Sequence, residues 1–311
     1  KDHITIKEYM EEIANYLKEI GANNNLVQSI VNSSSKVEET LIAIRKKLYP
    51  NQKIHDQIPL TLAYAYTLSR SLTVQAVIDN KILRDNNAVP IYLGGDDILA
   101  LSPIKFNEKY VVLDSATQTR ESYWRFADNS NNKFDGFKSY AGMTVDSLRA
   151  YGRSYSVFIA HYKDPLPLSI SISNYLLELK DGVEGKDVIF ISSGRGISNF
   201  DYSILKFSKS GEYDDSQIKM VGEILELMEN KKKISNSFIY DAISISEYKG
   251  EKEVFKRLVY KVIDRNTSDE EVAKGLYNEL NNILGNYVCN GNACENKETF
   301  LSIIYAVSYL R

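Results

Sequence analysis

The spacing of apolar residues predicts helices in the first part of the chain. Thr5 and Glu8 form a capping box at the start of the first helix, and Gly21 follows its end. Its apolar positions, three or four residues apart, are Ile6, Met10, Ile13, Leu17 and Ile20. A second helix is predicted over residues 37–48. We interpret residues 1–56 as a helical preface.

A long helix and a hairpin are predicted next. Residues 59–80 are apolar on nearly every side, which is typical of a helix packed flat on a sheet. Two short apolar runs of strand type, residues 89–93 and 98–101, are separated only by two glycines and two aspartates, which indicates a tight hairpin. Residues 102–150 are polar, aromatic and irregular, so we expect loops that form an insertion.

Further strands are predicted in the middle of the chain. Short apolar runs predict strands over residues 156–160, 188–192 and 202–207, and residues 170–180 predict a helix between the first two. Strands and helices therefore mix over residues 57–210, and we expect an α+β domain there.

The last third of the chain predicts an all-helical C-terminal domain, residues 211–311. The apolar face of its first helix holds Ile218, Val221, Ile224, Leu225 and Met228. Ser268 and Glu271 predict the cap of a later helix, and apolar residues at helical spacing over 300–310 predict a final one. The predicted fold class is α+β with helical domains on both sides.

Charge and composition exclude several classes of protein. The 311 residues carry 38 lysines and arginines and 41 aspartates and glutamates, a net charge of −3, so no global positive field attracts nucleic acid. Arg70 and Gln75 interrupt the longest apolar stretch, so no membrane partner is expected. No secretory leader follows Lys1, and we expect a cytoplasmic protein. Cys289 and Cys294 predict a local disulfide or two free thiols rather than a metal site.

The tip of the predicted hairpin, Gly94-Gly95-Asp96-Asp97, has residues suited to nucleotide chemistry. A turn lets Asp96 and Asp97 project together, whereas neighbours on a regular strand point to opposite faces. Gly94 and Gly95 leave room for a phosphate beside the backbone. Paired carboxylates suit Mg²⁺ or Mn²⁺, and two such ions about 3.5–4 Å apart support nucleotidyl transfer. The alternative is a turn that contains glycine and aspartate because turns favour them.

Three separated segments resemble one known family. Residues 68–72 read Leu-Ser-Arg-Ser-Leu, and residues 91–101 read Ile-Tyr-Leu-Gly-Gly-Asp-Asp-Ile-Leu-Ala-Leu. Residues 157–166 read Val-Phe-Ile-Ala-His-Tyr-Lys-Asp-Pro-Leu. In this order and spacing they are similar to the large subunit of type III CRISPR effector complexes of the Cmr type. The resemblance covers approximately residues 57–210.

The resemblance implies a ferredoxin-like palm that converts ATP into cyclic oligoadenylate, an antiviral signal, when the assembled complex holds target RNA. It implies other effector subunits, guide RNA, target RNA and ATP as partners. Asp96 and Asp97 would be catalytic and hold two Mg²⁺ or Mn²⁺ ions, and Gly94 and Gly95 would make room for the triphosphate. Two family features are not found in this sequence: a first palm strand with an Asp-Gly-Asp segment, and an N-terminal nuclease domain. We therefore expect a fragment, and the position of a third metal-binding carboxylate stays open.

Other polar residues have two interpretations each. Lys163 is predicted to bind the triphosphate, although a solvated lysine is equally ordinary at the end of a strand. His161 is interpreted as a structural hydrogen-bonding residue, and residues 192–196 as a turn rather than a phosphate loop. Residues 231–233, three lysines, would offset a helix dipole. A further group is interpreted as packing of the insertion rather than as a surface for single-stranded nucleic acid: Arg120, Tyr123, Trp124, Arg125 and Phe126.

The sequence thus predicts a metal-dependent nucleotidyltransferase that makes cyclic oligoadenylate. Two alternatives remain: a palm-type nucleotide cyclase that makes a smaller messenger, and a non-catalytic scaffold or RNA-binding subunit of the same kind of complex.

Overall fold

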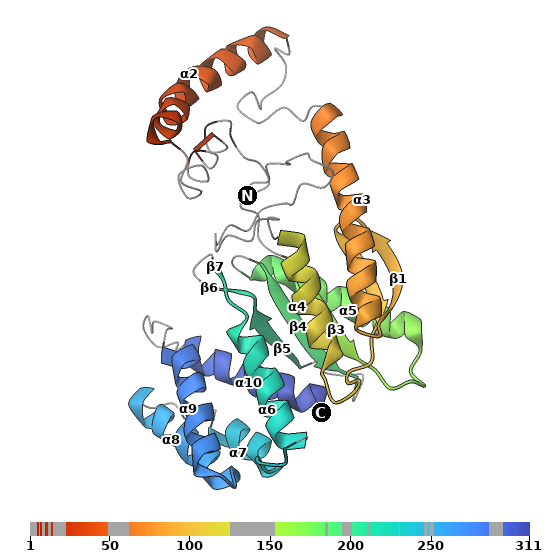
Figure 1. Cartoon of the computed structure of the whole chain (residues 1–311), viewed down its shortest axis with the longest axis vertical. Helices are drawn as coiled ribbons and strands as arrows, with labels where there is room; N and C mark the ends of the chain where they lie inside the picture. Colours follow the sequence, from red (N-terminus) through yellow and green to blue (C-terminus); the bar gives the residue numbers. More distant parts are fainter. Residues whose placement is uncertain are drawn as a thin grey trace. The chain divides into compact units, whose positions relative to one another are not determined.

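The computed structural model divides the chain into two units. It describes residues 5, 7, 10, 11, 14, 23–48, 62–124, 153–183, 186–194, 201–209, 212–229, 231–245, 248, 252–285 and 295–311. One unit comprises residues 1–81, 91–99 and 121–150, and the other comprises residues 82–90, 100–120 and 151–311. Figure 1 labels the elements of both units. The predicted domain boundaries near residues 56 and 210 stay predictions.

Two long helices precede the hairpin. Helix α2 spans Asn24–Leu48, and helix α3 spans Leu62–Asp85. Helix α2 begins well before the predicted residue 37 because Asn23 caps it, and its Oδ1 atom accepts a hydrogen bond from the N–H of Asn25 at 2.9 Å. Of the first predicted helix, the described residues 7, 10, 11 and 14 are helical, and the rest lies outside the described residues.

The sequence predicted a helix that is apolar on nearly every side and packed flat on a sheet. Helix α3 differs from this prediction, because it buries polar residues and exposes an apolar one. Val77 is 66% exposed, whereas Gln75 and Asp79 are buried. The Nε2 atom of Gln75 donates to Oδ1 of Asp79 at 2.9 Å and to Oγ of Ser122 at 2.8 Å. Because these buried polar groups are hydrogen-bonded to one another, the helix can turn them inward and leave an apolar residue in water.

The hairpin is confirmed. Strand β1, Val89–Gly94, and strand β2, Asp97–Leu101, form a two-stranded sheet with Gly95 and Asp96 as the connecting turn.

The prediction of loops over residues 102–150 holds for residues 102–110 and is wrong for the next fourteen, which form helix α4, Val111–Trp124. Its inward positions include polar as well as apolar residues, so the apolar periodicity is weak. Thr119 is buried and its Oγ1 atom bonds to the carbonyl of Ser115 at 2.6 Å and to the hydroxyl of Tyr155 at 2.9 Å. Residues 125–150 lie outside the described residues.

A three-stranded sheet forms the centre of the other unit. Strands β3 (Tyr155–Ile159), β4 (Val188–Ser193) and β5 (Tyr202–Lys206) lie in the order β3-β4-β5, with β3 parallel and β5 antiparallel to β4. All three confirm predicted strands within a residue. A parallel pair needs a crossover connection, which here contains helix α5, Leu166–Glu178, and a 3₁₀ turn, Leu179–Gly182.

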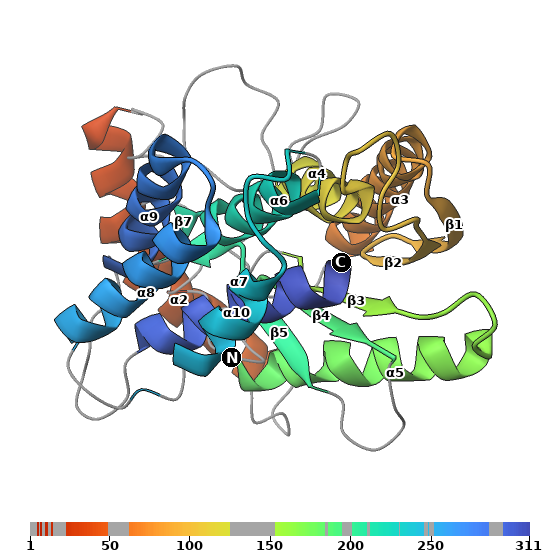
Figure 2. The ribbon, with the colours of Figure 1, turned by 90° about the horizontal axis from the view of Figure 1, so that it is seen from below.

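Alternation along β4 gives the sheet two buried faces. Phe190, on one face, packs with Ile172 and Leu176 of α5. Ile189 and Ile191, on the other face, belong to the large core. Figure 2 shows α5 along one side of the sheet and α10, Glu295–Leu310, on the other. A strand covered on both faces reads as a continuous apolar run, which explains why the sequence signal of β4 was clear.

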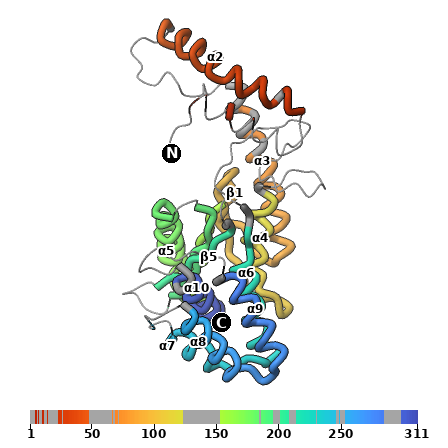
Figure 3. The backbone as a smooth tube through the Cα atoms, turned by 90° about the vertical axis from the view of Figure 1, so that its left-hand side faces the viewer, coloured from red at the N-terminus to blue at the C-terminus, as the bar shows by residue number. Residues whose placement is uncertain are grey.

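Helices dominate the described residues after residue 215. They are α6 (Ser216–Glu229), α7 (Ser237–Ile245), α8 (Lys252–Asn266), α9 (Glu270–Gly285) and α10. Figure 3 shows α7, α8 and α9 grouped beside α6 and α10. A short ladder of β6, Ser208–Lys209, and β7, Glu212–Tyr213, precedes them.

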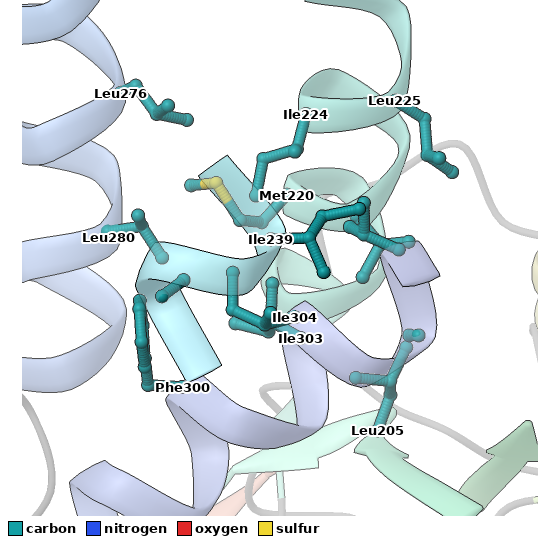
Figure 4. Packing of buried hydrophobic residues seen from close by; sticks show 14 of the residues in the cluster. Leu205, Met220, Ile224, Leu225, Ile239, Leu276, Leu280, Phe300, Ile303 and Ile304 are labelled. Carbon is teal, nitrogen blue, oxygen red and sulfur yellow. The ribbon is translucent and has the colours of Figure 1, made fainter. Parts of the chain in front are cut away.

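The large core joins these helices to the sheet. Ile224 and Leu225 of α6 and Ile304 of α10 are fully buried with Leu205 of β5, as Figure 4 shows. The predicted apolar face of α6 is therefore confirmed. The predicted cap of α9 is wrong: Asp269, rather than Ser268, accepts the N–H of Glu271 at 3.0 Å. Ser268 instead donates to the carbonyl of Lys233 at 3.4 Å.

Within the described part of the chain, every helix is too short or too polar to span a membrane.

Candidate functional site

The hairpin tip is a two-residue turn with glycine at its first position. Gly95 has φ +82°, and Asp96 is not among the residues with positive φ. One positive φ at the first central position is the signature of a type II′ turn, which fits the twist of paired strands and strongly favours glycine there. The turn places Asp96 at its second position and Asp97 at the first position of β2.

Helix α3 contacts the tip. A Cβ atom added to Gly95 would lie 3.1 Å from the Cβ atom of Leu72, so there is little space for a side chain on that side. Leu72 belongs to the Leu-Ser-Arg-Ser-Leu segment that the sequence analysis singled out. The helix therefore supports the turn directly, and two of the three segments that carry the family resemblance meet at this point.

The side chain of Tyr92 occupies the space beside Gly94. A Cβ atom added to Gly94 would lie 2.1 Å from the Oη atom of Tyr92 and 2.4 Å from its Cζ atom. Tyr92 is two positions before Gly94 on β1, so both residues are on the same face of the strand. Sequence reasoning missed this residue; an aromatic residue two positions before a glycine in a strand is the signal that would have found it.

Asp96 and Asp97 are both exposed at the tip. Mg²⁺ in nucleotide sites keeps several waters and takes one or two carboxylates together with substrate phosphates, so an exposed acidic pair is a suitable donor set. Among the described residues there is no cluster of three or more histidine, cysteine, aspartate or glutamate side chains that would hold a metal. A metal at the tip would therefore depend on the two aspartates and on phosphate oxygens.

Lys163 lies in the other unit, in an exposed turn after β3. Its Nζ atom is 5.4 Å from the ring centroid of Tyr162, and Tyr162 is 83% exposed. The Nδ1 atom of His161 accepts the N–H of Lys163 at 3.3 Å, and Asp164 accepts the N–H of His161 at 2.8 Å. His161 therefore has the predicted structural part in the turn, and nucleotide binding by Lys163 stays a prediction.

Other candidates have structural contacts. Arg120 is buried in α4, and its guanidinium donates to both carboxylate oxygens of Asp187, at 3.1 and 2.6 Å. The Oγ atom of Ser192 donates to the carbonyl of Asp201 at 2.8 Å. Lys231 and Lys233 pair with acidic residues at 3.0 Å each. Packing, rather than nucleic-acid binding, is thus confirmed for Arg120, whereas residues 125, 126, 195 and 196 lie outside the described residues.

The ion pair of Arg120 and Asp187 is deeply buried. Burial raises the pKa of Asp187 although the hydrogen-bonded guanidinium of Arg120 acts in the opposite direction. Asp187 also has a left-handed backbone, φ +49°, immediately before β4. The pair ties α4 to the start of the central strand and has no role at the hairpin tip.

Sequence comparison finds relatives for this chain. Residues 51–190 match the family model described as Cas10/Cmr2, second palm domain. The chain is 31% identical over 192 residues to the CRISPR system CMR subunit Cmr2 of Saccharolobus solfataricus, which covers 59% of this chain and 16% of that protein. It is 24% identical over 280 residues to the Cmr2 subunit of Pyrococcus furiosus, which covers 86% of this chain and 29% of that protein.

The fold is also similar to that of a solved structure. A chain in the electron cryo-microscopy structure of a type III-B Cmr-beta complex in its apo state matches with a TM-score of 0.55 and 22% identity. The match covers 97% of this chain and 30% of that one. The chain therefore spans less than a third of the length of each of these relatives.

Proposed function

We propose that the chain is the signalling part of a type III CRISPR effector subunit, because its residues 51–190 match the second palm domain of the Cas10/Cmr2 family. In this proposal the palm condenses ATP into cyclic oligoadenylate when the complex, with its other subunits and guide RNA, holds target RNA. The observation that carries it is the type II′ hairpin tip, which presents two adjacent exposed aspartates beside a pair of glycines.

The role of the two aspartates in this proposal is to bind metal ions. Asp96 and Asp97 would hold Mg²⁺ or Mn²⁺, two ions in the full site, which would activate a ribose 3′-hydroxyl and neutralise the leaving pyrophosphate. Both aspartates are exposed, so that hydrated ions can reach them. Gly94 and Gly95 place no side chain of their own at the tip, so that phosphate oxygens could approach the backbone, and Leu72 lies beside Gly95. Lys163 would bind the triphosphate of a nucleotide as a point charge.

The test is the double variant Asp96→Asn with Asp97→Asn. Removing both negative charges while keeping the side-chain shape should reduce the formation of oligoadenylate from ATP to background. The assay uses the complete gene product, assembled with its partner subunits and target RNA, with product chromatography as the readout. The thermal unfolding midpoint should not change, because both side chains are exposed.

The matched control is Asp264→Asn, the same substitution at an exposed position of α8. It should leave product formation unchanged. Undiminished synthesis by the double variant would refute the assignment of the tip.

One observation favours a second function, a scaffold or RNA-binding subunit without catalysis: the described residues add no third carboxylate to the pair at the tip. Calorimetry of the assembled complex with ATP and Mg²⁺ separates the two functions, since a scaffold would bind neither. A palm-type cyclase would instead give a mononucleotide or dinucleotide product in the same chromatography.

A further inference from the structure

The space beside Gly94, which the proposed function reserves for a phosphate, is filled by the ring of Tyr92. Three side-chain atoms of this tyrosine, the hydroxyl Oη and the ring atoms Cζ and Cε1, lie within 2.6 Å of the position that a Cβ atom on residue 94 would take. A phosphate oxygen needs at least the room of such an atom. The ring and a phosphate on this face of Gly94 therefore exclude each other.

The ring of Tyr92 is held weakly. Its side chain is 55% exposed, so more than half of its surface is still in water. The contact beside Gly94 is made by the far end of the side chain, which moves by rotation about its own bonds without any shift of the backbone. Exposed side chains change rotamer within nanoseconds, and each lost atom contact removes only a small dispersion energy. The ring can therefore leave this position at small cost.

We propose that Tyr92 is a movable cover on the nucleotide site, so that a nucleoside triphosphate binds at the hairpin tip only after the ring rotates away from Gly94. This inference rests on the proposed function. It assigns to Tyr92 an effect on nucleotide affinity, because part of the binding free energy is used to displace the ring. The hydroxyl oxygen of Tyr92 lies closest to the space beside Gly94, and the ring atoms Cζ and Cε1 also occupy it.

The experiment measures binding rather than turnover. α,β-Methylene-ATP with Mg²⁺ is titrated by calorimetry into the complete gene product in its complex, with the wild type, Tyr92→Ala and Tyr92→Phe. Removing the ring should tighten binding about threefold to tenfold, since the contacts to be broken are few and weak. Tyr92→Phe removes Oη but keeps the ring atoms Cζ and Cε1 beside Gly94, so its affinity should lie between those of the wild type and Tyr92→Ala.

The matched control is Tyr175→Ala. Tyr175 of α5 is also 55% exposed and is not one of the residues assigned to the nucleotide, so its removal should leave the dissociation constant unchanged. Equal or weaker binding by Tyr92→Ala, compared with Tyr175→Ala, would overturn the proposal.

A spectroscopic measurement covers the case in which Tyr92→Ala fails to fold. The wild type with 3-fluorotyrosine at position 92 should show a ¹⁹F shift toward that of free tyrosine when the analogue is added. A ¹⁹F signal that is unchanged at a saturating concentration of the analogue would show that the ring does not move, and would overturn the proposal.

The double aspartate variant separates the two hypotheses. If the wild type binds the analogue no better than that variant, the proposed function fails and the cover fails with it. If the wild type binds better but Tyr92→Ala has no effect, only the cover fails.

Discussion

The hairpin β1–β2 and the central strand β4 have similarly apolar sequences but opposite environments. Val89 and Ile91 of the hairpin are 62% and 47% exposed, whereas Ile189 and Phe190 of β4 are fully buried. The difference lies in what covers each strand: β4 has helices on both faces, and it pairs with a strand on each edge. Apolar content therefore predicts a strand, and the surrounding layers determine whether the strand contributes to stability.

The contrast separates the functional residues from the stabilising ones. The aspartates and Tyr92 project from the exposed hairpin, and the fully buried side chains of β4, β5, α6 and α10 hold the other unit together. Substitutions at the tip should therefore alter chemistry with little effect on folding, and substitutions in the core should do the reverse.

The largest effect that would sharpen this comparison is expected from the buried ion pair. Arg120→Met removes the partner of a carboxylate that is almost inaccessible to water, and it should destabilise the protein by about 4 kcal/mol. The measurement is chemical denaturation.

The pH dependence of Arg120→Met has a definite sign. Burial already raises the pKa of Asp187, so without the arginine the folded state takes up a proton more readily than the unfolded state. The variant should regain stability as the pH falls toward the unfolded pKa of aspartate, about 3.9. Lys231→Met, which breaks an exposed pair with Glu226, should cost less than about 1 kcal/mol and serves as the control. Equal losses in both variants would contradict the contrast between exposed and buried regions.

The same substitution made in both regions tests the comparison directly. Ile304→Ala empties a fully buried position in α10 and should cost about 3 kcal/mol, whereas Ile91→Ala, at a position that is 47% exposed, should cost less than about 1 kcal/mol. Urea titration of both variants measures the two values. Similar losses would show that the hairpin is as well packed as the core.

The smallest effect concerns two acidic residues on neighbouring helices. A hydrogen bond with Glu279 of α9, together with burial, raises the pKa of Glu223 of α6 to about 7. Since the folded state binds this proton more tightly than the unfolded state, the protein should gain stability as the pH falls from 8 to 5. The gain should be about 1 kcal/mol, because Glu279 is exposed and Glu223 is only partly buried, so that solvent screens their interaction.

Glu223→Gln should remove this part of the pH profile, measured as the unfolding midpoint in a series of buffers. Glu253→Gln, at a position of α8 whose side chain is 75% exposed, should leave it unchanged. A wild-type profile that survives Glu223→Gln would assign the pH dependence to other groups.

Sequence patterns correctly predicted those elements whose local residues alone determine their secondary structure. The hairpin was predictable because two short apolar runs and the Gly-Gly-Asp-Asp turn between them give the same answer. Helix α4 was not, because Thr119 and Arg120 face inward and depend on Tyr155 and Asp187, residues distant in sequence.

For the candidate site, the sequence predicted the turn residues. It did not predict that the side chain of Tyr92 limits the access of a phosphate to Gly94. Gly94 was interpreted as a space left for a ligand, whereas the structure places the ring of Tyr92 in that space. A side-chain rotamer depends on three-dimensional packing, so apolar periodicity and motif spacing carry no information about it.

The contact between β5 and α10 has a consequence for synthesis on the ribosome. The hydroxyl of Ser203 donates to the carbonyl of Ser302, 99 positions later, at 2.6 Å, and Leu205 is packed in the same core as α10. One face of the nascent sheet is therefore not fully covered until α10, which follows four further helices, has emerged from the exit tunnel. During that interval the sheet exposes apolar side chains that can aggregate, and we expect chaperones to bind this segment of the nascent chain.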